Sequence, residues 1–167
     1  MAKTPEVGTP APDFTLPGLL LAADDSGGDA ARGSYTLSEQ RGNPLVLVFY
    51  PGDNTAVCTK QLCAYTSDLD RFKDLGATVW GISPQDLDSH EGFARRYDLR
   101  FPLLADTARE VVKSYGIAVP GLGLRRSVFI IDAAGTVRWK HVALAGLTFQ
   151  SADTLTGELE KALAASS

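Results

Sequence analysis

Short apolar runs alternate along the chain with segments whose apolar residues recur every three or four positions. The run at residues 45–50 (LVLVFY) is rich in β-branched and aromatic residues, and it predicts a strand buried on both faces. Residues 51–54 (PGDN) end that strand in a turn. Beyond the turn, helical spacing connects four apolar positions, Leu62, Tyr65, Leu69 and Phe72. We therefore expect one helix that follows the turn and ends at Gly76.

The same two patterns continue through the rest of the chain. They predict further strands over residues 77–83, 101–105, 127–132 and 136–141, and further helices over residues 84–97, 108–115 and 151–165. Short strands at residues 14–16 and 35–37 would form an N-terminal hairpin with a Gly- and Asp-rich tip at residues 22–34. Strands that alternate with helices and end in a hairpin are typical of an α/β fold with a mixed central sheet flanked by helices, as in the thioredoxin-like fold.

Composition narrows the class of protein. A length of 167 residues predicts a single domain over residues 1–167, and 44% hydrophobic and 22% charged residues are typical of a globular protein. The formal net charge of -4 gives no reason to expect binding to nucleic acid or to acidic membranes. The apolar runs are too short to span a bilayer, and no apolar signal segment follows the N-terminus, so we expect a cytoplasmic protein.

Cys58 is predicted to lie in the first turns of the helix that follows the buried strand. In open α/β sheets, sites are built at the carboxyl ends of strands. A free thiol with a pKa of ~8.5 is mostly protonated at neutral pH, but the unpaired N–H groups at a helix N-terminus favour the reactive thiolate. A small, inert, buried cysteine is the alternative, and position alone leaves both interpretations open.

Cys63 is the other cysteine of the chain and lies five residues later. On an ideal helix this spacing separates the two Cα atoms by roughly 8–9 Å, whereas a disulfide needs less than ~7 Å. The two thiols therefore cannot bond while the helix is intact, which favours a redox switch over a static crosslink. Two unrelated core thiols are the alternative. Two cysteines alone exclude a disulfide scaffold and cannot complete a structural zinc site.

These residues carry a family resemblance. Pro51, Thr55 and Cys58, in the segment YPGDNTAVC, together with Cys63 resemble the signature of the peroxiredoxins, and in particular the peroxiredoxin Q or bacterioferritin comigratory protein group. Further matching blocks follow in the same order at residues 81–83 (GIS), 101–106 (FPLLAD) and 126–132 (RSVFIID). The resemblance extends from about Val7 to the last helix.

The resemblance implies a role for each motif residue. Cys58 would be the peroxidatic nucleophile that becomes a sulfenic acid, and Cys63 would resolve it as an intrachain disulfide. Thr55 would orient the peroxide, Arg126 would stabilise the thiolate and the leaving oxygen, and Pro51 would shield the site. The alternatives are a helix N-cap for Thr55, a solvated surface charge for Arg126, and a turn former at Pro51. Arg125 is the arginine we expect at the surface.

The implied enzyme is a thioredoxin-dependent peroxidase that reduces hydrogen peroxide and organic hydroperoxides. It would need no metal, haem, flavin or nucleotide cofactor, and a thioredoxin-type dithiol would reduce its disulfide. A resolving cysteine in the same helix removes the need for a partner chain, so we expect a monomer. His90 and His141 lie outside the motif blocks, and we expect both to be surface or strand residues without a catalytic role.

Three positions depart from the family pattern. Gln61 stands where many peroxiredoxins carry a glutamate that holds the arginine, and an amide oxygen still accepts a hydrogen bond. Trp80 is bulkier than the valine expected there and should fill core space. Residues 19–35 form a longer N-terminal hairpin than the family pattern predicts.

Two other classes of function remain open from the sequence. The chain could be a thioredoxin-fold thiol–disulfide oxidoreductase or redox relay, or a non-enzymatic redox-sensing or chaperone-like module. Oxidoreductases of this fold usually place their cysteines as C-x-x-C, whereas four residues separate Cys58 from Cys63 here.

Overall fold

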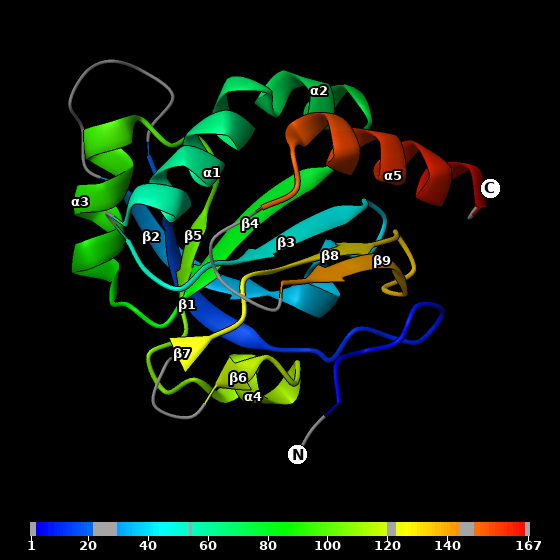
Figure 1. Ribbon diagram of the computed structural model, residues 1–167, viewed down its shortest axis with the longest axis horizontal. Helices are drawn as coiled ribbons and strands as arrows, with labels where there is room; N and C mark the ends of the chain where they lie inside the picture. Colours follow the sequence, from blue (N-terminus) through cyan, green and yellow to red (C-terminus); the bar gives the residue numbers. More distant parts are fainter. Residues whose placement is uncertain (1–2, 22–29, 54, 120–122, 144–148, 166–167) are drawn as a thin grey trace.

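The computed structural model describes residues 3–21, 30–53, 55–119, 123–143 and 149–165 (Figure 1). Within them, seven strands form one mixed sheet in the spatial order β2-β1-β5-β4-β3-β8-β9. These strands are β1 (Thr15–Leu20), β2 (Ala31–Thr36), β3 (Leu45–Phe49), β4 (Thr78–Ser83), β5 (Leu103–Ala105), β8 (Ser127–Ile131) and β9 (Val137–Val142). The helices are η1 (Leu37–Gln40), α1 (Ala56–Ser67), α2 (Leu69–Asp74), α3 (Leu87–Tyr97), α4 (Glu110–Ser114) and α5 (Ala152–Ala165).

Strand β3 lies inside the sheet. It pairs in parallel with β4 and antiparallel with β8, and all five of its residues are buried. An apolar run without polar alternation suits this position, because both faces of the strand are covered. The predicted buried strand is confirmed.

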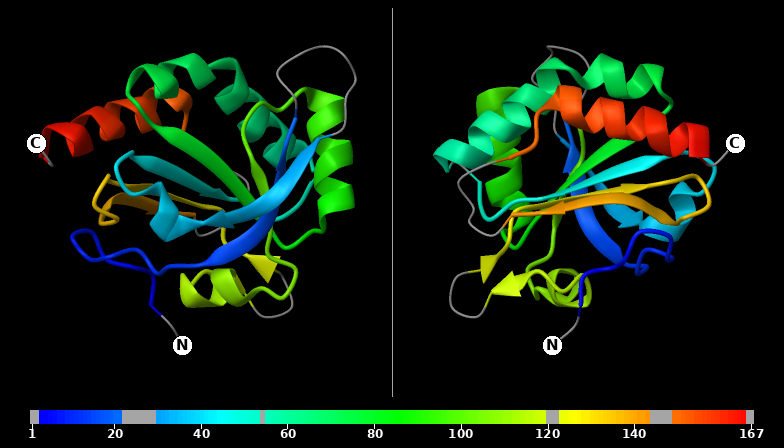
Figure 2. Two further views of the ribbon diagram at one scale, coloured as in Figure 1. Left: turned by 180° about the vertical axis from the view of Figure 1, so that it is seen from behind. Right: turned by 45° about the vertical axis from the view of Figure 1, so that its right-hand side comes forward.

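Helices cover both faces of the sheet (Figures 1 and 2). Val46 and Val48 of β3 pack into one core with side chains of α1, α2, α3 and α5. Leu47 and Phe49 point to the opposite face and pack with side chains of α4, η1 and the segment before β1. Trp80 lies in this second core with 1% of its surface exposed, as expected for a residue that fills core space. The predicted mixed sheet with flanking helices is confirmed.

The parallel pairing of β3 and β4 decides where the functional residues meet. The carboxyl ends of the two strands lie at the same edge of the sheet, with Phe49 opposite Ile82. Helix α1 begins shortly after β3, and α3 begins shortly after β4. The start of β8 reaches the same edge, because Ser127 pairs with Phe49.

Several predicted boundaries are wrong. The helix expected up to Gly76 is two helices, because Asp68 leaves the helical conformation with φ -102° and ψ 15°. Helix α3 begins at Leu87 rather than at Pro84, since the Asp86 carboxylate accepts a hydrogen bond from Ser89 N and caps the helix there. Helix α4 is also shorter than predicted.

Two β segments differ from the predicted ones. In the N-terminal hairpin, β1 and β2 pair over six residues each, so both strands are longer than predicted, while residues 22–29 of its tip lie outside the described residues. In the segment expected to be a loop before β8, the short strands β6 (Ala118–Val119) and β7 (Gly123–Leu124) pair with each other. Among the described residues, no helix is long and apolar enough to cross a membrane.

Gly81 of β4 offers a test of the packing behind the site. A Cβ atom at this position would lie 2.9 Å from Leu103 Cδ2 and 3.3 Å from Tyr50 Cε1. We expect Gly81→Ala to lower the free energy of unfolding by about 1–3 kcal/mol, because it overpacks the core. Gly92→Ala is the matched control. Gly92 is exposed in α3 with nothing within 4 Å of its Cβ position, so alanine should stabilise the helix by about 0.5–1 kcal/mol. Equal urea midpoints for the two variants would contradict this packing.

Candidate active site

Cys58 lies in the first turn of α1, at the carboxyl edge of the sheet. Thr55 occupies the N-cap position with an extended backbone, and Cys58 is the third residue of the helix. The Thr55 hydroxyl does not cap the helix and instead donates to Gly52 O at 3.0 Å. The first turn contains no acidic side chain, so its N–H groups and the positive end of the helix dipole act on Cys58 without a competing negative charge in that turn.

Arg126 approaches Cys58 from the neighbouring strand. It immediately precedes β8, and its Nη2 donates to Cys58 Sγ at 2.9 Å. Both side chains are buried, with 3% of Arg126 and 0% of Cys58 exposed. Burial alone is typical of an inert cysteine, but a guanidinium in contact with the sulfur stabilises the thiolate anion. Arg126 is therefore not the solvated surface charge of the alternative interpretation, whereas Arg125 is exposed as expected.

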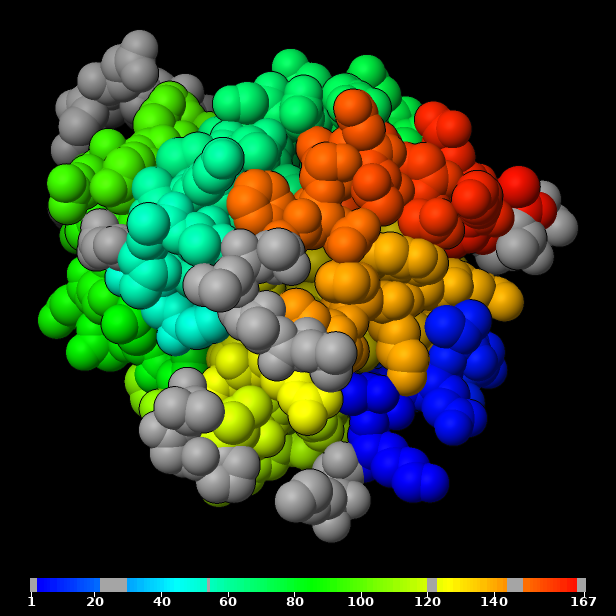
Figure 3. Space-filling model, viewed as in Figure 1, coloured from blue at the N-terminus to red at the C-terminus, as the bar shows by residue number. Residues whose placement is uncertain are grey.

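A polar chain holds Arg126 in place. Its Nη1 donates to Gln61 Oε1, Gln61 Nε2 donates to Tyr65 OH at 3.2 Å, and Tyr65 OH donates to Gln150 O. The amide of Gln61 thus accepts from the arginine, as expected for a residue in the position of the family's glutamate. Burial raises the pKa of Tyr65 to about 12, so its hydroxyl remains a donor at neutral pH. The segment that leads into α5 lies against α1 at the surface (Figure 3), and its Gln150 O accepts the hydrogen bond from Tyr65.

Cys63 lies on the same helix as Cys58 but in a different environment. Both cysteines are free, Cys58 is buried, and Cys63 is half-buried. Burial raises the pKa of the Cys63 thiol. Since α1 is continuous from Ala56 to Ser67, ideal helix geometry keeps the two Cα atoms roughly 8–9 Å apart. The structure thus agrees with the inference that a bond between the thiols requires part of α1 to unwind.

The structure brings the predicted site residues together to different degrees. Cys58 and Arg126 are in direct contact. Thr55 and the half-buried Pro51 flank the short loop that leads into α1. Cys63 is separated from Cys58 by more than one helical turn. Their chemical roles remain predictions at this point.

The expectation that His90 is a surface or strand residue is wrong, and its lack of a catalytic role stays a prediction. His90 lies on α3 with no exposed surface, and its Nδ1 lies 2.7 Å from Asp53 Oδ2. Asp53 lies in the loop before α1, and no motif in the sequence identifies it as a partner of His90. Helical spacing gave a usable signal, because His90 precedes the buried Phe93 by three residues and shares its face of the helix. His141 lies on β9, as a strand residue, and its ring stacks on Trp139.

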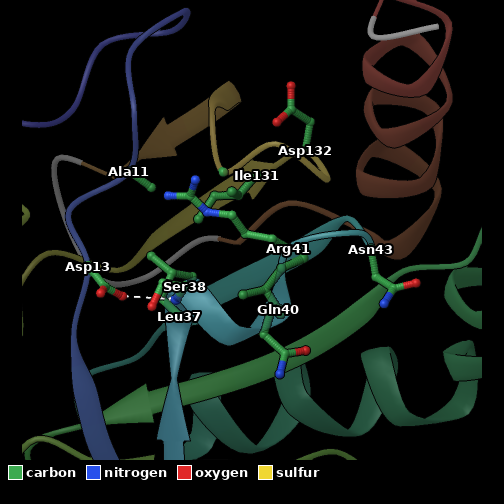
Figure 4. Close-up of a pocket in the computed structure, with 11 residues that line it drawn as sticks. Ala11, Asp13, Leu37, Ser38, Gln40, Arg41, Asn43, Ile131 and Asp132 are labelled. Carbon is green, nitrogen blue, oxygen red and sulfur yellow. Dashed lines mark hydrogen bonds between the residues drawn. The ribbon is translucent and has the colours of Figure 1, made fainter.

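A small pocket elsewhere on the molecule does not belong to this site (Figure 4). Arg41 reaches into it, and Asp13 accepts a hydrogen bond from Ser38 N at its margin. Leu45 and Ile131, which pair at the opposite end of β3 from Cys58, complete its lining. The pocket therefore lies at the far edge of the sheet from both cysteines.

Substitution of Arg126 tests its contact with the sulfur. Lysine keeps the charge but offers one nitrogen in place of the two that reach Cys58 and Gln61. In a Cys63→Ser background, we expect Arg126→Lys to slow alkylation of Cys58 by iodoacetamide at pH 6 by about tenfold, because the thiolate loses a fixed donor. Arg125→Lys is the matched control and should alkylate at the parent rate. Equal rates for Arg126→Lys and its parent would refute the role of this contact.

Solved structures share the fold. AhpC from Mycobacterium bovis superposes with a TM-score of 0.84 over 97% of this chain and 94% of its own, at 23% sequence identity. The reduced 2-Cys peroxiredoxin from Plasmodium vivax superposes with a TM-score of 0.85 over 95% of this chain and 82% of its own, at 22% identity. These likenesses establish the thioredoxin-like α/β fold of the peroxiredoxins.

Sequence relatives are closer. Chloroplastic peroxiredoxin Q from Oryza sativa subsp. japonica is 38% identical over 134 residues, which cover 79% of this chain and 57% of the rice protein. The Arabidopsis thaliana protein of the same name is 39% identical over 146 residues, covering 78% of this chain and 65% of its own. The chain thus spans less than two thirds of the length of these two relatives. The AhpC/TSA family matches residues 7–140, and the chain belongs to this family of peroxiredoxins.

Proposed function

We propose that this protein is a thiol peroxidase that reduces hydrogen peroxide and organic hydroperoxides. The observation that carries the proposal is the buried contact between Arg126 and Cys58 Sγ in the first turn of α1. It places a positive charge and helix N–H groups around one sulfur, and this arrangement supports a reactive thiolate. Membership of the AhpC/TSA family and similarity to proteins named peroxiredoxin Q support the same activity.

In the first step, the Cys58 thiolate attacks one peroxide oxygen. An S–O bond forms, the O–O bond breaks, and the departing oxygen takes up a proton to leave as water or an alcohol. The departing oxygen gains negative charge in the transition state, so donors fixed around it accelerate the step. Arg126 and the N–H groups of the first turn supply these donors, and the Thr55 hydroxyl orients the peroxide. Pro51 limits access of water to the site.

In the second step, Cys63 attacks the Cys58 sulfenic acid. The S–S bond forms and one molecule of water leaves. Since α1 keeps the thiols apart, its first turns unwind before this step. A dithiol of the thioredoxin type then reduces the disulfide by exchange and is itself oxidised to a disulfide. The whole cycle uses one chain, so we infer that a monomer suffices.

Variants of the two cysteines separate the steps. Cys58→Ser should abolish peroxide consumption coupled to thioredoxin. Cys63→Ser should still consume one equivalent of peroxide and then stall as a sulfenic acid or over-oxidise. Mass spectrometry after stoichiometric peroxide should show a Cys58–Cys63 link within one wild-type chain. A disulfide-linked dimer, or full turnover of Cys63→Ser with thioredoxin alone, would contradict the proposed resolution.

The rate of the second step should depend on pH. Burial raises the pKa of Cys63 while α1 is folded, and an unwound α1 returns it to the ordinary value of ~8.5. Above that pH the Cys63 thiol is mostly deprotonated in the unwound segment, whereas in the folded helix it keeps its proton to higher pH. Rising pH therefore favours unwinding, and it also forms the thiolate that attacks Cys58. We expect disulfide formation, followed by rapid quench after a peroxide pulse, to accelerate between about pH 7 and pH 9. A rate that is flat or falls over this range would contradict attack by a Cys63 thiolate on the sulfenic acid.

A thiol–disulfide oxidoreductase or redox relay is the alternative activity. The two are distinguished by comparing peroxide consumption coupled to the thioredoxin system with insulin-disulfide reduction driven by dithiothreitol without thioredoxin, above the rate of dithiothreitol alone. Peroxide consumption no faster than with free cysteine would refute the peroxidase. Disulfide reduction in the absence of peroxide would favour the alternative.

A further inference from the structure

A cluster of polar side chains lies beside the loop that leads into α1, of which residues 51–53 and Thr55 are described. This cluster is separate from the contact between Cys58 and Arg126. Its centre is Asp53, of which 6% is exposed. Three groups surround the carboxylate: Tyr50 OH donates to Oδ1 at 2.7 Å, Ser89 Oγ donates to Oδ2 at 2.7 Å, and His90 Nδ1 lies 2.7 Å from Oδ2. Tyr50 and His90 have no exposed surface. Asp53 thus connects the loop to α3 through buried groups.

The hydrogen-bond partners fix the protons of this pair. His90 Nε2 lies 2.9 Å from Leu104 O, and a carbonyl oxygen only accepts, so Nε2 carries a proton. His90 Nδ1 and Asp53 Oδ2 face each other at 2.7 Å and need one further proton between them. With both protons in place, the pair is neutral as a unit and each of these contacts is satisfied. Removing either partner leaves a buried polar group without its counterpart, which is costly in a protein interior.

Further contacts extend the connection to Thr55. The backbone N–H of Asp53 donates to Gln85 Oε1, and Gln85 lies between β4 and α3. The Cβ position of Gly52 is 3.5 Å from Gln85 Nε2, so this side chain packs against the loop. The Thr55 hydroxyl then donates to Gly52 O. The loop is therefore held from α3 through to the N-cap of α1.

We propose that the buried Asp53–His90 pair positions residues 51–53 and Thr55 for the peroxide step and confines the unwinding of α1 to residues beyond Thr55. The second half of this proposal rests on the proposed resolution by Cys63. Asp53 and His90 act through Thr55 and the helix start and do not touch the substrate, so they are positioning residues. Misplacement of reacting groups by about 1 Å can cost a reaction about a hundredfold, so an anchor of this kind affects the rate directly.

Two anchors hold the start of α1, and only one of them involves the reacting sulfur. Downstream, Arg126 holds α1 through Cys58 and Gln61, so oxidation of the sulfur alters that contact. Upstream, the Asp53–His90 pair contains no atom that changes during the cycle. The loop can therefore stay in place while α1 unwinds.

Tyr50 lies close to both Asp53 and Cys58, but it takes no part in the reaction. Burial, with the neighbouring Asp53 and Cys58 charges adding to it, raises the pKa of Tyr50 well above its ordinary value. Its hydroxyl therefore remains a neutral donor to Asp53 throughout the pH range of the reaction. Its ring lies close to Gly81 of β4, where an added Cβ atom would be 3.3 Å from Tyr50 Cε1.

The first test isolates the peroxide step in a Cys63→Ser background, with the rate constant of sulfenic acid formation measured by rapid quench with hydrogen peroxide. We expect Asp53→Ala to lower this constant by about tenfold, because the loop loses its anchor. Asp53→Asn should recover most of the loss, since an amide can accept from Tyr50 and donate to a neutral His90. Glu91→Gln, on the next residue of α3, is the control and should react at the parent rate. An Asp53→Ala rate equal to the parent, or an Asp53→Asn rate as low as that of Asp53→Ala, overturns the proposal.

The second test separates positioning from a general loss of structure. With Cys63 present, we expect Asp53→Ala to slow sulfenic acid formation while the later step, disulfide formation, keeps its rate or accelerates. Equal slowing of both steps would overturn the proposal. Should Asp53→Ala not fold, Gln85→Ala removes a contact to the same loop without unpairing a buried charge, and it should slow the first step alone by about threefold. Failure of the proposed function is distinguishable, because the parent would then form no sulfenic acid.

Discussion

A buried positive charge in contact with a buried sulfur is the interaction on which the arrangement of this site depends. Arg126 is brought to Cys58 because β8 pairs antiparallel with β3, so the residue before β8 meets the helix that follows β3. A guanidinium in the interior needs partners for its donors, and the sulfur and Gln61 supply two of them. A series of hydrogen bonds runs from Arg126 through Gln61 and Tyr65 to the segment before α5. This series holds the guanidinium in contact with Cys58 Sγ.

The proposed cycle places two opposing demands on helix α1. In the structure its first turn is formed, with Thr59 N donating to Thr55 O at 2.9 Å, and Cys58 Sγ accepts a hydrogen bond from Arg126. In the proposed second step the same turn opens, because no intact helix brings Cys63 to Cys58. In that proposal the contacts through the sulfur hold the turn only while the sulfur is reduced, so oxidation weakens the helix. The Asp53–His90 pair gives the preceding loop a support that does not depend on the redox state.

The sequence predicts the parts of the structure that depend on local pattern. An unbroken apolar run identifies β3, and helical spacing places Cys58 at a helix start. The same spacing conceals the break at Asp68, because the apolar positions of α1 and α2 continue in phase across it. The burial of Arg126 cannot be derived from local pattern, since it depends on the pairing of β8 with β3, and only the family resemblance indicated it. Helical spacing indicates the burial of His90 but not its partner, because Asp53 lies 37 residues away along the chain and neither residue has a local signal for their contact.

Hydrogen–deuterium exchange of α1 tests the central claim, that this helix must be formed for the peroxide step and opened for the disulfide step. The measurement compares the reduced protein with a sample whose Cys58–Cys63 link has been verified by mass spectrometry. We predict that amides of residues 59–63 are protected in the reduced protein and exchange rapidly in the disulfide form, while those of β3 remain protected in both. Unchanged protection of residues 59–63 in the disulfide form would contradict the account.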